Sequence, residues 1–560
     1  MVALAPGKTT GWEQRVAHFR ASERCRYFVT PMATAQMNNT SGTLDWRPKA
    51  NPWLISIAVM LGTFMEVLDT SIANVALPHI AGNLSASVDE ATWVLTSYLV
   101  SNAVILPATG WLSRYFGRRR FLICCMVIFT LASALCGMAN SLGFLIFARI
   151  LQGAGGGALQ PIAQAVLFES FPAEKRGTAM SFYAMGVVVA PILGPTVGGW
   201  LTDDYSWRWA FYINLPIGIL AVVLCLLFLE DPPYLKNQKA GSIDYVGFGL
   251  LMLWIACLQI LLDKGQDEDW FSSNFIRWLA VGAFVGFIAF LVWEMREKHP
   301  IVNLRVLTDR NLAVGAGLNL AIGAILYGTT ALLPQFLQNL LGYPAFQSGL
   351  VMSPRGIGAI IGSVVSGRIM AKVDGRAWMV GGIMLLSYSM FLFGGLTLEV
   401  APANVIWPII LSGFAVTSIF VPMSTFSMTT IKREYTGDAT GLTSLLRNLG
   451  GSIGISVLTT LVYRGSAAHR ALLVGHLTPY DTPYREKLHL LQTALGSQAD
   501  ATTAQHQAYG LIAQTLQNQA QLFSYVDQFR MLVIACLCCI PLVLLLKKGS
   551  SPAQKPSMGH

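Results

Sequence analysis

Two acidic residues stand inside the first strongly apolar stretch of the chain. Glu66 and Asp69 are three positions apart, so in a helix both side chains lie on one face. A carboxylate at membrane depth is unfavourable unless it faces a partner or a water-filled cavity. Such a group could bind and release a proton, which makes both residues candidates for proton coupling. The alternative is that one of them lies hydrated at the end of its helix.

Arginines also occur within apolar stretches. Arg149 stays charged at any working pH, so inside a helix bundle it needs an acidic or carbonyl partner, and Asp69 or Glu66 could supply one. Alternatively it reaches the interface from near the start of its span. Arg355 and Arg447 also lie within apolar stretches. Arg447 either faces a water-filled cavity inside the bundle or pairs with a carbonyl at a helix end.

The elements that position these residues follow from composition. The chain has 560 residues, of which 54% are hydrophobic and only 12% charged, and its mean hydropathy is +0.53. Its apolar residues form blocks of about 18–25, the length of a membrane-spanning helix. We therefore predict an all-α polytopic membrane protein. Its 14 predicted spans begin near Trp53, Trp93, Phe121, Leu142, Thr178, Trp209, Ile243, Arg277, Asn311, Gln347, Ala377, Asn404, Gly437 and Phe529.

The formal charge of +9 is spread through short connections between spans. This dispersal argues against a nucleic-acid partner, which requires basic residues gathered on one surface. With a cytoplasmic N-terminus, the inner loops hold about 17 Lys and Arg and the outer loops about three. The bias predicts that both termini are cytoplasmic.

Enzymatic and metal chemistry find little support. Eight of the nine cysteines lie in apolar blocks, without His or acidic residues at ligand spacing. The soluble segments contain no Ser-His-Asp arrangement and no nucleotide-binding loop. We expect no metal, no cofactor and no enzymatic activity, although a membrane enzyme or receptor is kept as an alternative.

One connection is long. Residues 465–528 separate the last two predicted spans and fall on the outer side. Within them Tyr509, Ile512, Leu516, Ala520 and Phe523 recur at helical spacing, which predicts an amphipathic helix. It either packs on the protein's own outer surface or docks a partner. At the other end of the chain, Met32 is an alternative to Met1 as the start of translation.

An internal repeat divides the chain. The second span ends in a segment from Gly110 to Arg119, with Gly117 and Arg118 in its tight basic turn, and the tenth ends in a similar segment from Gly367 to Arg376 that contains Asp374. Duplicated halves with a site between them are common in secondary transporters. The predicted organisation comprises a tail (1–51), a six-helix half (52–230), two extra helices (231–300), a second six-helix half (301–548) that includes the loop 465–528, and a tail (549–560).

The fifth span carries a stripe of small residues. Gly186, Ala190, Gly194 and Gly198 follow at steps of four, with Pro195 and Gly199 nearby. The pattern is typical of a tight helix–helix seam, and in a transporter it is also a candidate for the moving contact between the halves.

Five segments together resemble the motif series of the 14-span drug:proton antiporters of the major facilitator superfamily. They are Leu68 to Pro78, Trp93 to Tyr98, Arg149 to Gly157, Ala190 to Gly199, and Trp207 to Gly218. Leu262 to Gly265 with Asp269-Trp270, and Arg447 to Gly454, resemble the EmrB-type branch. The resemblance covers about residues 50–548.

The resemblance implies proton-driven export of hydrophobic or cationic drugs across the inner membrane of a bacterium. It also implies an EmrA-like periplasmic adaptor and an outer-membrane channel as partners. Asp69 matches the acidic position of the first span in that family. At the fifth position of the turn motif the superfamily usually has an acid, whereas this chain has Arg114, so Asp374 could serve instead.

Further residues are candidates for the substrate cavity. Flexible and aromatic side chains suit varied apolar cations, and each candidate could equally be plain packing. The candidates in the second half are Tyr327, Gln335, Gln338, Met423, Phe426 and Arg447. Asn74, Tyr98 and Gln152, which lie in the matched motifs, complete the expected cavity. A siderophore, sugar or organic acid remains an alternative substrate on this fold.

Overall fold

The computed structural model describes residues 48–232, 244–370, 373–478, 480–496 and 500–547, and every regular element in these ranges is helical. This confirms the predicted all-α fold. Nearly all of the predicted N-terminal tail, the choice between Met1 and Met32, and the C-terminal tail lie outside the described residues.

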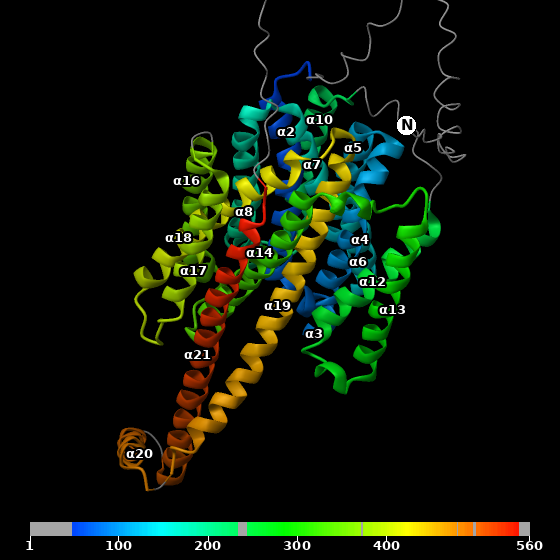
Figure 1. Ribbon diagram of the computed structural model, residues 1–560. Coiled ribbons are helices and arrows are strands. Elements are labelled where there is room, and N and C mark those ends of the chain that lie inside the picture. The colour runs from blue at the N-terminus through cyan, green and yellow to red at the C-terminus, as the bar shows by residue number, and fades with distance from the viewer. Residues whose placement is uncertain (1–47, 233–243, 371–372, 479, 497–499, 548–560) are drawn as a thin grey trace, which may run out of the picture. The chain divides into compact units, whose positions relative to one another are not determined.

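The helices fall into two groups that we call the first half and the second half. The first half contains α2 (Pro52–Asn83), α3 (Val88–Ala91), α4 (Trp93–Phe116), α5 (Arg118–Gly137), α6 (Leu142–Gly156), α7 (Leu159–Ser170), α8 (Arg176–Asp204), α9 (Trp209–Tyr212) and α10 (Asn214–Phe228). The second half contains α14 (Arg310–Gln335), α15 (Ala345–Met352), α16 (Pro354–Ile369), α17 (Gly375–Phe393), α18 (Pro402–Thr429), α19 (Thr436–Val474), α20 (Thr482–Leu495) and α21 (Ala501–Leu544). Between them in the chain come α12 (Tyr245–Lys264) and α13 (Asn274–Arg296), which pack against each other at the side of the bundle (Figure 1); α12 contacts α4 of the first half and α19 of the second.

Thirteen helical segments of the described residues are long and apolar enough to cross a membrane. Helix α4 is not among them, although it has 24 residues. Its buried positions include polar residues such as Thr96, Tyr98 and Asn102. A span that faces other helices rather than lipid can carry such residues, and with α4 the predicted 14 spans are all helical.

The fourth span is broken at its centre. Helix α6 ends at Gly156 and α7 begins at Leu159. Glycines near the break let the span approach α4 closely. Gly153 and Gly157 lie against the carbonyls of Tyr98 and Asn102, where a Cβ would collide. The break presents Gln152 and Gln160 on separate helix segments, each facing a different part of α2.

The long connection 465–528 is mostly helical rather than a loop. Helix α19 continues to Val474 and α21 already begins at Ala501, so both run beyond the other helices, with α20 at their far end (Figure 1). Gln517 donates to Ser466 at 3.3 Å across this hairpin. We call the end of the bundle from which the hairpin projects the hairpin face, and the opposite end, which carries Arg114, Arg118 and Lys432, the basic face.

The amphipathic segment predicted before Tyr525 therefore belongs to α21 itself. Ala520 is fully buried, whereas Tyr509 and Phe523 remain about two-fifths exposed. Phe523 lies beside the His469 ring of α19, with the ring centroids 5.7 Å apart. Part of the apolar face thus packs inside the hairpin, and part stays open.

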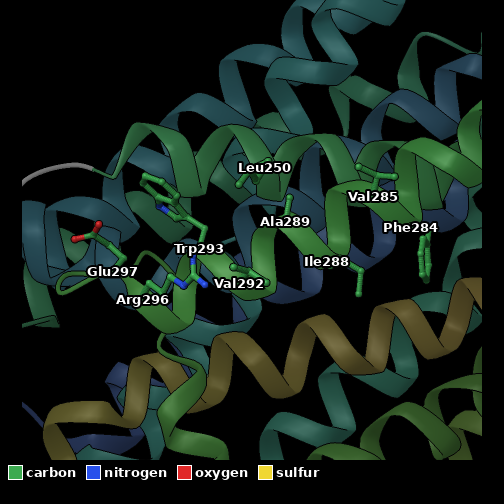
Figure 2. Close-up of a pocket in the computed structure, with 9 residues that line it drawn as sticks. All are labelled: Leu250, Phe284, Val285, Ile288, Ala289, Val292, Trp293, Arg296 and Glu297. Carbon is green, nitrogen blue, oxygen red and sulfur yellow. The ribbon is translucent and has the colours of Figure 1, made fainter.

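Helix α13 turns an apolar surface outward. A shallow groove along it is lined by Phe284, Val285, Ile288 and Val292, with Leu250 from α12, and ends at Arg296 and Glu297 (Figure 2). Phe284 is 68% exposed, as expected for a side chain against lipid tails. The groove lies far along the chain from the acidic residues of α2 and carries no polar group at its centre.

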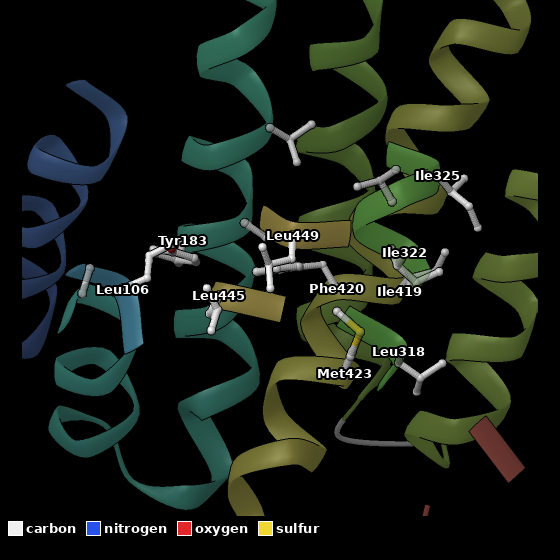
Figure 3. Packing of buried hydrophobic residues seen from close by; sticks show 14 of the residues in the cluster. Leu106, Tyr183, Leu318, Ile322, Ile325, Ile419, Phe420, Met423, Leu445 and Leu449 are labelled. Atoms are coloured by element: carbon white, nitrogen blue, oxygen red, sulfur yellow. The ribbon is translucent and has the colours of Figure 1, made fainter. Parts of the chain in front are cut away.

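The two halves meet through α8 with α15, α16 and α18, and through α4 with α19. The middle of this interface is apolar. Figure 3 shows Tyr183 of α8 and Leu106 of α4 on one side, with Phe420, Leu445 and Leu449 of the second half opposite. The rings of Tyr183 and Phe420 are stacked with centroids 6.2 Å apart.

Candidate transport site

Asp69 lies in a closed polar cluster inside the first half. Its Oδ2 accepts from Nη1 of Arg149 at 2.6 Å, and both side chains are completely buried. Its Oδ1 accepts from Gln152 and from Asn214, each at 2.8 Å. The sequence proposal that Arg149 pairs with an acid of the first span agrees with this placement.

Arg149 has further partners. Its Nε donates to the carbonyl of Val94 at 3.0 Å, and Nη1 also donates to Gln152 at 2.8 Å. The guanidinium lies 4.2 Å from the centroid of the Tyr98 ring, a cation–π geometry. The predicted residues Asp69, Arg149, Gln152 and Tyr98 thus form one unit on three spans, and Asn214 of α10 joins a fourth span to it.

Glu66 has different surroundings, although it is only one turn away on α2. Its Oε1 accepts from Asn102 at 3.1 Å and its Oε2 from Gln160 at 2.7 Å. Both donors are neutral amides, and the side chain is 5% exposed. Protonating Glu66 would therefore not break a direct ion pair.

Gln160 carries this contact across to the second half. While its amide nitrogen donates to Glu66, its Oε1 accepts from Nη2 of Arg447 on α19 at 2.5 Å. The Arg447 guanidinium lies 5.4 Å from the ring centroid of Phe420. The chain Glu66, Gln160, Arg447 therefore crosses between the halves, next to the apolar interface.

A second link between the halves lies at the basic face. Arg114, near the end of α4, donates to Asp438, near the start of α19, at 2.6 Å. Gly110 is necessary beside it, because a Cβ there would collide with the side chain and backbone of Asp438. The turn motif of the first half thus supplies the base of this ion pair, Arg114, and the second half supplies the acid, Asp438.

The rest of that motif holds the turn together. Gly117 has a positive φ of 83°, which favours glycine, and Arg118 forms a buried ion pair with Glu169 of α7. The sequence suggests Asp374, in the matching turn of the second half, as a substitute for the missing acid. It caps α17 by accepting from the backbone N–H of Arg376 at 3.1 Å, and its side chain is 38% exposed.

The glycine stripe of α8 faces its own half. A Cβ at Gly186 would meet Met60, and one at Gly194 or Gly198 would meet Ser71 or Ile72, all on α2. The idea of a moving contact between halves is therefore wrong for these three glycines. Pro195 does face the second half, against Gly349, while Gly199 has open space around it.

The other predicted cavity residues are dispersed. Asn74 is exposed and donates to the Thr70 carbonyl of its own helix at 3.0 Å. Tyr327 lies against Gly451 near Arg447, and Met423 is buried in the core. Phe426 lies beside Gly375 near the basic face. Only Tyr327 of these four lies near the Glu66 network.

Two predicted glutamines are placed differently. Gln335 lines an open cavity of about 740 Å³ at the hairpin face, between α14, α19 and α21. Gln338, which is half-buried, follows it in the irregular turn after α14. Arg355 donates to the Thr330 hydroxyl at 2.9 Å rather than to an acid.

Sequence reasoning did not single out Gln160, Asn102, Asn214 or Asp438. Each is a polar residue within or beside an apolar run, which was the available signal. Spacing could not reveal their partners, because Gln160 and Glu66 are 94 positions apart. The described residues contain no group of three or more His, Cys, Asp or Glu that could hold a metal ion.

Two helical halves, linked by buried charged and amide side chains beside an apolar interface, are the architecture of a secondary membrane transporter. The comparison with known proteins agrees. A profile of the Major Facilitator Superfamily matches residues 59–455. The chain belongs to the Major Facilitator Superfamily, and its relatives place it in the branch that contains the EmrB proteins.

Three relatives illustrate this branch. The chain is 37% identical to the fatty acid resistance protein FarB of Neisseria gonorrhoeae, over 92% of this chain and 100% of the relative. It is 39% identical to the multidrug export protein EmrB of Haemophilus influenzae, over 76% and 84% of the two chains. It is 37% identical to EmrB of Escherichia coli K12, over 88% and 95%.

A solved structure supports the fold alone. The human organic anion transporter MFSD10 (TETRAN) superimposes with a TM-score of 0.54 at 13% identity, covering 87% of this chain and 100% of that one.

Proposed function

We propose that the protein is a proton-coupled exporter of hydrophobic or cationic drugs that works by alternating access. The observation that carries this proposal is the buried Glu66 at the joint between the halves, bonded through Gln160 to Arg447. Two EmrB relatives are named multidrug export proteins, which supports the drug class. The driving force is the proton gradient, with no cofactor.

Glu66 is the proton carrier in this mechanism. As a carboxylate it accepts from Gln160, which orients the amide so that its oxygen accepts from Arg447. A proton on Glu66 removes the negative charge to which Gln160 donates. The hydrogen bond from Gln160 becomes weaker, and with it the link through Gln160 to Arg447 in the other half. The halves can then rearrange, and a drug cation that reaches the site competes with the proton for the same carboxylate.

Asp69 has a structural and electrostatic role. Protonating it would break a completely buried ion pair with Arg149, at a cost of about 3–5 kcal/mol. Arg149 and Asp69 instead fix the hairpin-face part of α2 against α4, α6 and α10. Their network holds α2 so that Glu66, three residues earlier, points at Asn102 and Gln160.

The distribution of basic residues supports one orientation in the membrane. We propose that the basic face is cytoplasmic, that both termini are cytoplasmic, and that the hairpin lies in the periplasm of a Gram-negative inner membrane. Arg114, Arg118 and Lys432 all lie at one face, as expected for the positive-inside pattern.

In this orientation the hairpin would bind a periplasmic EmrA-like adaptor, and the adaptor would connect the protein to an outer-membrane channel. Helix α20 has no buried residue, and Leu472, Tyr480 and Leu490 near the tip are 62–92% exposed. Exposed apolar residues gathered on a projecting element are typical of an interaction surface.

Amphipathic carboxylates such as fatty acids are a second substrate class. The relative FarB is named for fatty acid resistance, and Arg447 offers a buried cation near the interface. Competition by oleate against a lipophilic cation in one assay distinguishes the two classes.

The test of coupling uses purified protein in liposomes. Efflux of tetraphenylphosphonium driven by an imposed pH gradient should fall at least tenfold in Glu66→Gln, because the amide cannot exchange a proton. The control is Glu399→Gln, the same change at an exposed position between α17 and α18. Gradient-driven efflux that persists in Glu66→Gln would refute the assignment.

A further inference from the structure

The two extra helices carry polar residues that the transport site does not use. Leu262 to Gly265 and Asp269-Trp270 stand at the hairpin-face end of α12 and in the turn that follows it. Helix α12 contacts both α4 of the first half and α19 of the second half. These residues make most of the polar contacts of α12.

The contacts with the first half involve charges. Asp263 accepts from the hydroxyl of Thr96, and Lys264 donates to the hydroxyl of Thr92, both at the start of α4. Lys264 is only 6% exposed and is thus withdrawn from water, whereas Asp263 lies on the exposed side of the helix; both are paired with hydroxyl groups. Charge-assisted hydrogen bonds are the stronger kind, so this end of α12 belongs firmly to the first half.

The contacts with the second half are between neutral groups. Gln259 donates to the Ser452 hydroxyl at 2.5 Å, and the indole N–H of Trp270 donates to the Thr460 hydroxyl at 3.1 Å. Ser452 and Thr460 lie eight residues apart on α19, which spans about 12 Å of helix. Both contacts lie on the part of α19 between Arg447 and the hairpin.

Trp270 is held in an unusual backbone conformation. Asp269 and Trp270 have φ values of 51° and 53°, in the left-handed region that non-glycine residues rarely adopt. The backbone N–H of Trp270 donates to the carbonyl of Gly265 at 2.6 Å, and the indole ring packs where a Cβ of Gly265 would lie. Strained residues of this kind persist where the surrounding structure fixes them for a purpose.

We propose that α12 is a strap that joins α4 to α19 near the hairpin face and favours the closed state of that face. This rests on the proposed function, because the strap acts on the opening that alternating access requires. When the hairpin face opens, α12 stays with α4 through Asp263 and Lys264. The bonds from Gln259 and Trp270 to α19 break.

The strap complements the Arg114–Asp438 pair. That pair joins α4 and α19 at the basic face, and the strap joins the same two helices toward the hairpin face. The balance of the two links sets which face opens more readily. Gln259, Trp270 and Thr460 are positioning residues and do not touch the substrate.

The experiment measures distances between spin labels in the full-length protein. Labels at Asn83 and Thr397, exposed positions at the hairpin face of each half, report its opening, and labels at Lys175 and Lys432 report the basic face. Pulsed electron resonance with and without tetraphenylphosphonium, at pH 6 and pH 8, gives the populations of short and long distances.

Trp270→Phe keeps the ring and removes the N–H donor, and Thr460→Val keeps the shape and removes the acceptor. Because a single net hydrogen bond corresponds to about a fivefold change in an equilibrium, each variant should raise the ratio of open to closed hairpin face about threefold to fivefold. The double variant should show the effect of one change, not the product of both. Trp278→Phe, at a lipid-facing indole that is 75% exposed, is the matched control.

Two failures are distinguishable. Wild-type distances that do not respond to ligand or pH would overturn the proposed alternating access itself. A wild-type response with an unchanged open-to-closed ratio in Trp270→Phe and Thr460→Val would overturn the strap alone. If either variant is poorly folded, Gln259→Leu with Ser452→Ala tests the second contact by the same ratio.

Discussion

At the scale of single residues, two carboxylates one helical turn apart have different hydrogen-bond partners. Asp69 shares an ion pair with Arg149 inside the first half, whereas Glu66 is held by two amides at the joint between halves. In the proposed function, this difference makes Asp69 a structural charge and Glu66 the group that exchanges a proton.

Neutralising Asp69 should damage the fold. Asp69→Asn leaves Arg149 buried with only carbonyl partners, so we expect a loss of about 3–5 kcal/mol of stability. Thermal unfolding in detergent should show a clearly lower midpoint than wild type. The double variant Asp69→Asn/Arg149→Met removes both charges and should recover part of the loss; a double variant less stable than Asp69→Asn would contradict the pairing.

The sequence identified Glu66, Asp69 and Arg149 as charges that need partners, and it named the correct candidates for Arg149. It could not separate the roles of the two acids, because both share one helix face. The difference arises from Gln152, Gln160 and Asn214, whose directions depend on the break between α6 and α7 and on packing between distant spans.

At the scale of helices, the stripe on α8 is a fixed seam with α2. Gly194→Ala places a methyl group where Ser71 lies, whereas Gly199→Ala meets nothing within 4 Å. The first change should lower stability by about 1–3 kcal/mol, and the second should leave it unchanged or raise it by up to about 1 kcal/mol. Equal melting points for these two matched variants would show that the seam is not tight.

The pair at the basic face is the corresponding link between halves. Arg114→Gln leaves the buried Asp438 without its cation and should open the basic face at least tenfold more often. The exchanged double variant Arg114→Asp/Asp438→Arg should restore closure in part. The distance between labels at Lys175 and Lys432 checks this, and an unchanged distribution in Arg114→Gln would argue against a latch.

The start of α21 should respond to acid. Hydrogen bonds from Thr502 and Thr503 hold the pKa of the exposed Asp500 well below its usual range. Because the folded pKa is depressed, the stabilisation is present above the unfolded pKa of about 3.9 and is lost as the pH falls below it. Hydrogen exchange, corrected for the intrinsic rate, should show weaker protection of this turn below about pH 4, and Asp500→Ala should lack the transition.

At the scale of the whole molecule, the number of spans and the helical class were predictable because apolar length is a strong signal. Helix α4 is one of the 14 predicted spans although it has a polar face, because that face packs against other helices. The hairpin was expected as a loop with one amphipathic helix, because Gln-rich and His-rich segments lack the apolar signal. Its helices form by continuing α19 and α21 and by packing on each other, which local composition does not reveal.

The hairpin tip is separable from transport in this account. Replacing residues 475–500 by a short glycine linker leaves α19, α21 and the Glu66 network intact, so efflux from liposomes should stay within about twofold of wild type. In cells, co-purification of a periplasmic adaptor should be lost. Loss of liposome transport with the adaptor still bound would reverse the assignment.

The central claim is that Glu66 releases a proton when a drug cation binds. Adding tetraphenylphosphonium to the purified, weakly buffered protein near neutral pH should acidify the solution in wild type and in Glu399→Gln. Glu66→Gln should give no substrate-dependent proton release. Release from Glu66→Gln equal to that of wild type would contradict the account.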